Sequence, residues 1–207
     1  CKITVDQIGN IFARRPGKDS GAPPVVMGSH LDTQPTGGRF DGVYGVLTGL
    51  EVIRTLNDSG IETQHPIEVV SWTNEEGSRF APPMLASGVF SGIYDLDFAL
   101  SRRDIDDKIF GEELKSIGYA GVEPVGRRPM HAYLEVHIEQ GPVLVEEQQM
   151  IGIVTDAQGQ RWYELVLVGK ESHAGPTPMD RRHDALLGAA RVIEMVNRIG
   201  QENAPNA

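Results

Sequence analysis

The sequence has little cysteine, few basic residues and no long apolar run, and each shortage excludes a class of protein. Its single cysteine, Cys1, allows no internal disulfide and no cysteine-rich zinc module, and it favours a reducing compartment, here the cytoplasm. Lys and Arg number 19 against 29 Asp and Glu, and the resulting net charge of −10 argues against a nucleic-acid partner. No apolar run approaches the roughly 18–20 residues that span a bilayer, so we expect no membrane partner.

Three short apolar segments have the pattern of strands, and polar residues follow each of them. They are "PPVVMGSHLDT" (23–33), "PIEVVSWT" (66–73) and "AYLEVHIEQG" (132–141). Helical patterns lie between them, most clearly from Gly42 to "NDSG" at 57–60, and again over 106–119. This alternation predicts an α/β fold, with a mixed, mainly parallel sheet sandwiched by helices. In such sheets, ligands bind beyond the carboxyl ends of the strands.

The pattern changes after about residue 155, where a second domain begins. "QRWYELVLVGKESHAG" (160–175) predicts a longer strand, and the apolar spacing that follows predicts a helix over 180–199 with Asp180 as its N-cap. We therefore expect two domains, 1–154 and 155–207. The chain starts without Met and stops just after a helical pattern, so we expect it to be a piece of a longer polypeptide with both domains incomplete.

Residues that suit a metal centre gather at the ends of the three predicted strands. If those strands are parallel neighbours, the residues converge on one edge of the sheet. Neutral imidazoles and carboxylates together suit zinc, and also manganese, cobalt or nickel. A cation there would let one carboxylate of the adjacent pair in "TNEEGSRF" bind metal while the other takes a proton from water. The residues are His30, Asp32, Asp41, Glu75, Glu76 and His137.

Each of these residues also has a simpler explanation when it is taken alone. A histidine at a strand end is usually a hydrogen-bonded structural residue, Asp41 would cap the following helix, and Glu75–Glu76 would be a solvated surface pair. A non-catalytic α/β domain that serves assembly through a strand edge is a further alternative. A serine hydrolase is less favoured because the sequence contains no G-x-S-x-G. The metal centre explains why all six residues occur at three strand ends.

Four segments, in order along essentially the whole chain, resemble one enzyme family. They are "GSHLDTQPTGGRFDGVYGV", "TNEEGSRF", "EVHIEQGP" and "SHAGPTPMDRRHDAL". They resemble the hydantoinase/carbamoylase-type binuclear metal amidases, which include N-carbamoyl-L-amino-acid hydrolases, β-ureidopropionases and allantoate amidohydrolases and are related to aminoacylases and zinc carboxypeptidases. The resemblance implies a zinc-peptidase-like catalytic domain over 1–154 and the start of an α+β lid and dimerisation domain over 155–207.

The resemblance also implies an activity on small-molecule substrates. We expect hydrolysis of a linear amide or ureido C–N bond, in an N-carbamoyl-L-amino acid or N-carbamoyl-β-alanine, to give amino acid, ammonia and carbon dioxide. Allantoate amidohydrolase and related aminoacylase or dipeptidase activities remain alternatives. Relatives are about twice as long, so we expect the fragment itself to be inactive and the full-length protein to be a homodimer.

The resemblance assigns roles to particular residues around two divalent metal ions. Asp41 would bridge the ions, and its peptide bond to Gly42 would be cis. His30 and His137 would complete one site, and Glu76 would bind the other ion with a histidine outside this chain. Glu75 would be the general base, and Asp32 would hold His30. His173 would donate a hydrogen bond to the developing oxyanion, and Gln160 would contact the substrate.

Overall fold

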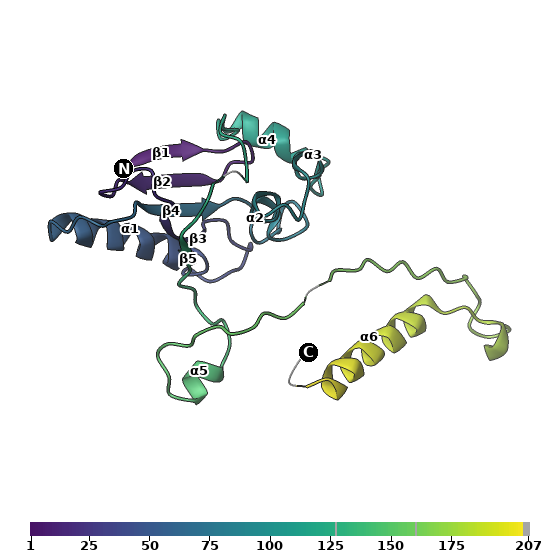
Figure 1. Ribbon diagram of the computed structural model, residues 1–207. Coiled ribbons are helices and arrows are strands. Elements are labelled where there is room, and N and C mark those ends of the chain that lie inside the picture. Colours follow the sequence, from purple (N-terminus) through teal and green to yellow (C-terminus); the bar gives the residue numbers. More distant parts are fainter. Residues whose placement is uncertain (127, 160, 205–207) are drawn as a thin grey trace. The chain divides into compact units, whose positions relative to one another are not determined.

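The structure, a computed structural model, describes residues 1–126, 128–159 and 161–204, which divide into two compact units, Cys1–Pro142 and Val143–Ala207 (Figure 1). The first unit contains a five-stranded sheet in the order β1-β2-β4-β3-β5. Its strands are β1 (Lys2–Val5), β2 (Ile11–Arg15), β3 (Val25–His30), β4 (Ile67–Trp72) and β5 (Ala132–Leu134), and its helices are α1 (Val43–Asp58), α2 (Leu85–Phe90), α3 (Leu96–Leu100) and α4 (Phe110–Ser116). The division into domains 1–154 and 155–207 stays a prediction.

The sheet is mixed, as the sequence predicts. β3 is parallel to both β4 and β5, whereas β2 is antiparallel to β1 and β4. The strands expected at 23–33 and 66–73 are confirmed as β3 and β4, but β5 ends at Leu134 instead of continuing to residue 141. Among the described residues β5 pairs only with β3, so its far side lacks the partner that would extend the ladder.

Both faces of the central strands are buried. Successive side chains of a strand point to opposite faces, and on each face they pack into a different apolar cluster. Val69 packs with Val46 and Ile53 of α1, and the neighbouring Val70 packs with Phe12 and Trp72 on the other face. A third cluster joins α2, α3 and α4 through Leu85, Ala86, Val89, Ala99, Phe110 and Leu114. The carboxyl ends of β3 and β4 are therefore held between packed layers.

One charged side chain of β4, Glu68, is buried in the sheet and lies between two arginines. Glu68 is only 1% exposed, and Arg128 Nη1 lies 3.1 Å from its Oε1 while Arg14 Nη1 lies 3.7 Å from its Oε2. The Arg128 guanidinium also lies over the Phe12 ring, 4.1 Å from the centroid. A buried carboxylate needs such partners, because removing one leaves an uncompensated charge away from water.

The second unit contains helices and, among its described residues, no strand. They are α5 (Val143–Glu146), the short 3-10 helix η1 (Met179–Arg181) and α6 (Ala185–Glu202). The strand predicted over 160–175 is wrong for residues 161–175, because a strand requires a hydrogen-bonded neighbour and the described part of this unit offers none. Asp180 is not the N-cap of the predicted helix; Asp184 is, and its Oδ1 accepts from the Leu187 amide at 3.0 Å.

Candidate metal centre

The register of the parallel strands brings two histidines to the same point of the sheet edge. β3 and β5 pair Met27 with Leu134, and His30 and His137 each lie three residues further along. Their imidazole rings are stacked, with centroids 5.7 Å apart. His30 is 2% exposed, whereas the side chain of His137 is 33% exposed, so one ring is held in the core and the other closes the site from the outside.

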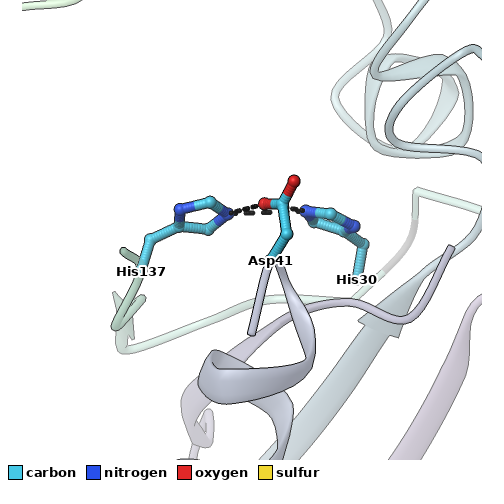
Figure 2. A group of neighbouring side chains, drawn as sticks. All are labelled: His30, Asp41 and His137. Atoms are coloured by element: carbon cyan, nitrogen blue, oxygen red, sulfur yellow. Dashed lines mark hydrogen bonds and ion pairs between the residues drawn. The ribbon is translucent and has the colours of Figure 1, made fainter. Parts of the chain in front are cut away.

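Asp41 joins the two histidines to form a three-residue group that could hold a metal ion (Figure 2). Asp41 Oδ1 lies 3.2 Å from His137 Nε2 and 3.8 Å from His30 Nε2, and the two Nε2 atoms are 3.5 Å apart. Asp41 is 3% exposed. The helix-capping alternative does not hold, because the N-cap of α1 is Gly42 and no side chain caps that helix end.

The hydrogen bonds on the far side of each ring determine which nitrogen is free. His30 Nδ1 lies 2.8 Å from the Asp32 carbonyl, and His137 Nδ1 lies 2.8 Å from the Ile138 carbonyl. A carbonyl oxygen only accepts, so each Nδ1 carries a proton, and each ring turns its Nε2 toward the other ring and toward Asp41. Two Nε2 atoms and one carboxylate oxygen therefore face one point, and in the neutral Nδ1–H tautomer both Nε2 atoms have the lone pair that a divalent cation requires.

The spacing of these three atoms also fits a metal ion. In a tetrahedral zinc site with bonds of about 2.0–2.1 Å, neighbouring ligand atoms are about 3.3 Å apart. The measured separations of 3.2, 3.5 and 3.8 Å bracket that value. The group therefore matches zinc, and its mixture of imidazole and carboxylate also suits manganese, cobalt or nickel.

Gln140 forms a hydrogen bond with the other carboxylate oxygen of Asp41. Its Nε2 donates to Asp41 Oδ2 at 2.9 Å, and its backbone has the left-handed φ of 52° that is uncommon for a residue other than glycine. The oxygen that a bridging role would turn to a second ion is thus hydrogen-bonded in this structure. The cis peptide bond among the described residues joins Ala81 and Pro82, so the cis bond implied between Asp41 and Gly42 is wrong.

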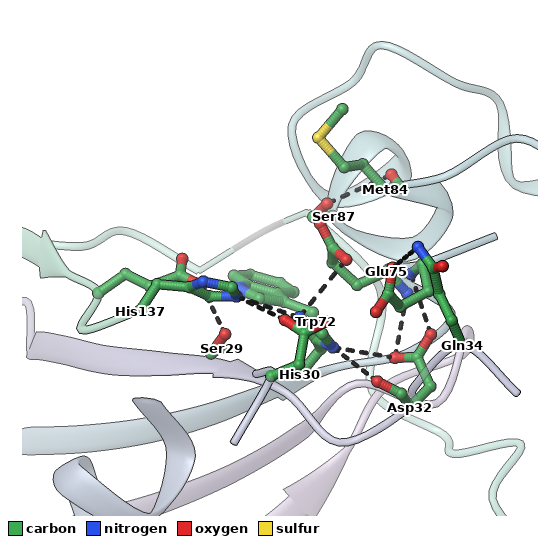
Figure 3. Close-up of polar contacts among 12 residues, drawn as sticks. Ser29, His30, Asp32, Gln34, Trp72, Glu75, Met84, Ser87 and His137 are labelled. Atoms are coloured by element: carbon green, nitrogen blue, oxygen red, sulfur yellow. Dashed lines mark hydrogen bonds and ion pairs between the residues drawn. The ribbon is translucent and has the colours of Figure 1, made fainter. Parts of the chain in front are cut away.

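Asp32 supports the site in a different way from the one implied by the family resemblance. The His30 ring bonds to the Asp32 main-chain carbonyl, whereas the nearer carboxylate oxygen is 3.8 Å from Nδ1. The carboxylate instead accepts from the backbone amides of Glu75 and Glu76, at 3.2 and 3.0 Å (Figure 3). One residue therefore links the loop after β3, which carries His30, to the loop after β4, which carries both glutamates.

The two adjacent glutamates have different surroundings. Glu75 Oε2 lies 3.5 Å from His30 Nε2, beside the triad. Burial, and to a smaller extent the negative charges of Glu76, Asp32 and Glu135, raise the pKa of Glu75, while the nearby His30 acts in the opposite direction. Glu76 is not part of the triad; Gln34 Nε2 donates to its Oε2 at 3.2 Å, and its buried Oε1 has no hydrogen-bond partner among the described residues. An unpartnered buried carboxylate oxygen is costly, and a cation would satisfy it.

The remaining predicted residues belong to the second unit or lie outside the described residues. His173 belongs to the second unit, is exposed, and accepts a hydrogen bond at Nδ1 from the Gly175 amide at 3.0 Å. Gln160 lies outside the described residues. The roles of both, and the complete set of metal ligands and catalytic residues, stay predictions.

Two residues that the sequence did not single out belong to the site. Gln140 precedes a Gly–Pro pair, and its side chain contacts Asp41. Glu135 accepts from Ser29 Oγ at 2.6 Å and from the Tyr133 hydroxyl at 2.8 Å, which ties β5 to β3 beside the metal group. Both lie within three residues of His137, so proximity to a ligand in the sequence was the signal available for finding them.

Known proteins are similar to this chain in sequence and in fold. The model of peptidase family M20/M25/M40 matches residues 26–205. The chain belongs to this family. It is 59% identical over 203 residues to an N-carbamoyl-L-amino-acid amidohydrolase of Rhizobium meliloti, covering 98% of this chain and 49% of that protein. It is 36% identical to an allantoate amidohydrolase of Bacillus subtilis, covering 91% of this chain and 46% of that one.

A solved structure supports the same membership of the M20/M25/M40 family. The crystal structure of an amidase of the hydantoinase/carbamoylase family from Burkholderia vietnamiensis matches with a TM-score of 0.92 and 66% identity, covering 99% of this chain and 50% of that chain. The expected resemblance and fold class are thereby confirmed. The chain spans about half the length of these relatives. In the part of the chain that the structure describes, no helix is long and apolar enough to cross a membrane.

Proposed function

We propose that the full-length protein hydrolyses the C–N bond of a linear ureido compound, with an N-carbamoyl-L-amino acid as the substrate class. The observation that carries this proposal is the convergence of two histidine Nε2 atoms and one carboxylate oxygen, at 3.2–3.8 Å from one another. Members of this family are metal-dependent, and relatives that match nearly all of this chain are named as amidohydrolases of such substrates. His30, His137 and Asp41 would hold the first ion, and Glu76 would help to hold a second.

A divalent ion in this position lowers the pKa of water and stabilises negative charge on oxygen. The chain's own residues then hold and move protons. Glu75 Oε2 accepts the proton that water loses as it attacks the carbamoyl carbon, and the same oxygen returns this proton to the departing amino nitrogen. Asp32 holds the Glu75 backbone in place through its amide. His173 would donate a hydrogen bond to the oxyanion that forms in between.

The reaction consumes one water. The bond between the carbamoyl carbon and the amino-acid nitrogen breaks, the free amino acid leaves, and the carbamic acid that remains decomposes to ammonia and carbon dioxide. The homodimer, the cytoplasmic location and the choice of zinc over manganese, cobalt or nickel are predictions of the same proposal.

The variant Glu75→Gln of the full-length protein tests the proton-transfer step. Because glutamine cannot accept the proton, we expect kcat to fall by about 10²–10⁴-fold on N-carbamoyl-L-amino acids while metal content stays unchanged. Glu62→Gln, at an exposed position, is the matched control and should behave like the wild type. Full activity of the Glu75→Gln variant would remove Glu75 as the base.

The alternatives give different results in the same preparation. Turnover of N-carbamoyl-L-amino acids, N-carbamoyl-β-alanine and allantoate, measured side by side after loading with each metal, identifies the preferred substrate. A protein that serves only assembly would bind no stoichiometric metal and would hydrolyse none of the three.

A further inference from the structure

An apolar groove opens beside Glu75. Its volume is about 410 Å³, within the roughly 300–1,000 Å³ range of small-molecule pockets. Met84, Phe90, Ile93, Tyr94 and Met130 line it, together with the aromatic rings of Trp72 and Tyr133. Figure 3 shows Met84 and Ser87 on the α2 side of the site, near Glu75. The groove is therefore continuous with the metal centre through the carboxylate of Glu75, which lies 3.5 Å from His30.

The polar atoms of the two aromatic side chains beside Glu135 are hydrogen-bonded within the protein. The Trp72 indole N–H donates to the Tyr133 hydroxyl at 3.0 Å, and that hydroxyl donates to Glu135 Oε2 at 2.8 Å. Neither of these two rings therefore offers a free donor to a ligand, and most of the surface that the groove presents is apolar, from aromatic rings, Ile93 and the thioethers of Met84 and Met130. Such surface favours another aromatic or bulky apolar group.

The ionisable carboxyl groups of the groove are not balanced by basic side chains in its described lining. The described residues that line it include two carboxylates, Glu75 and Glu135, but no Lys, Arg or His. An acidic group that entered the groove would leave water and face the like charge of both carboxylates, with no basic side chain among the described lining residues to pair with. The groove therefore disfavours acidic substituents.

We infer that this groove receives the side chain of the substrate, so that the enzyme prefers N-carbamoyl-L-amino acids with an aromatic or bulky apolar side chain. The inference rests on the proposed function, because it assumes that the reacting carbamoyl group lies between Glu75 and the triad. It distinguishes among the candidate substrates, since N-carbamoylglycine and N-carbamoyl-β-alanine have no side chain to fill the groove and allantoate carries a second ureido group instead.

A larger side chain at Ser87 would fill part of the groove. Ser87 lines the groove on α2, and its hydroxyl contacts the Met84 carbonyl of the preceding turn at 3.2 Å. In the full-length, metal-loaded protein we expect kcat/KM for N-carbamoyl-L-phenylalanine to exceed that for N-carbamoylglycine by about 10-fold or more, the factor typical of moving such a side chain out of water. Ser87→Leu should reduce this ratio by about 10-fold, because leucine occupies the space.

Two further variants complete the experiment. Ser116→Leu is the matched control, since Ser116 makes the same contact with a carbonyl three residues earlier but does not line the groove; its ratio should equal that of the wild type. Ile93 lies in the groove wall and is 75% exposed, so Ile93→Lys places a cation there with little disturbance of packing. It should raise kcat/KM for N-carbamoyl-L-glutamate relative to N-carbamoyl-L-phenylalanine, a gain that misfolding cannot imitate.

The outcomes separate this inference from the function on which it rests. Hydrolysis of both neutral substrates without preference for phenylalanine, or a preference that Ser87→Leu and Ile93→Lys leave unchanged, overturns the groove assignment and keeps the proposed function. A lower melting temperature of Ser87→Leu with an unchanged ratio would show that another part of the polypeptide fills the groove, and this also overturns the assignment. No hydrolysis of any N-carbamoyl compound overturns both.

Discussion

Gly42 lies directly behind the His30 ring, and its replacement by alanine should weaken metal binding without removing a ligand. Gly42 has a φ of +67°, and a Cβ added there would meet His30 Cγ at 2.5 Å. Carbon atoms in contact are normally about 3.5–4.0 Å apart, so the ring would have to move by about 1 Å. Metal–ligand distances tolerate only about 0.2 Å, so a shift of this size removes His30 Nε2 from bonding range.

Two effects of Gly42→Ala can be separated by a matched variant. A positive φ costs an alanine roughly 1–3 kcal/mol of backbone strain, and strain of this kind also applies at Gly60, whose φ is +62° but whose added Cβ would meet nothing within 4 Å. Both variants should therefore lose about 1–3 kcal/mol of unfolding free energy from the backbone alone, and the loss should be larger at Gly42, whose ψ of −47° lies outside the left-handed helical region. Only Gly42→Ala should also lose metal affinity, by about 10–100-fold or more, which is the usual effect of disturbing the support of a ligand.

The assay is a titration of the metal-free protein with Zn²⁺ in competition with a chromogenic chelator, accompanied by urea denaturation of the same samples. It needs no substrate and no knowledge of the reaction. The reasoning is refuted if Gly42→Ala binds Zn²⁺ as tightly as Gly60→Ala, because His30 would then be unnecessary for binding or free to move without loss.

Two further predictions concern the scaffold. Arg128→Met should lower the unfolding free energy by about 3–5 kcal/mol, because it leaves the buried Glu68 without its nearer cation; urea denaturation measures this, and Arg54→Met, at a side chain that is 74% exposed, should change little. Asp184→Ala should cost about 1 kcal/mol by removing the N-cap of α6, whereas Asp180→Ala should not; equal effects of the two variants on thermal unfolding would show that the capping geometry is misplaced.

The elements that carry the metal group could be predicted from the sequence because their signals are local. The apolar runs of β3 and β4 and the helical spacing of α1 are strong enough to indicate the element without knowledge of its neighbours. Parallel strands in one sheet then bring their carboxyl ends together, which is why His30 and His137 were expected to meet although 107 positions separate them. The register of β3 and β5 is the physical basis of that success.

The features that were missed depend on partners far away in the sequence. β1 and β2 are short strands whose burial comes from pairing with each other and with β4, and the segment 161–175 has the composition of a strand but no described neighbour to pair with. The contact of Gln140 with Asp41 spans 99 positions, and no local pattern at "EQGP" indicates it. Asp32 was correctly placed beside His30, but a sequence does not show whether a main-chain or a side-chain oxygen holds the ring.

The central claim is that His30, His137 and Asp41 bind a divalent ion. Anomalous scattering at the zinc edge, from crystals of the full-length protein grown with Zn²⁺, tests it most directly. The account predicts a peak about 2.0–2.2 Å from Nε2 of both histidines and from Asp41 Oδ1. A crystal with zinc bound elsewhere, and with these three side chains turned away from one another, would contradict it.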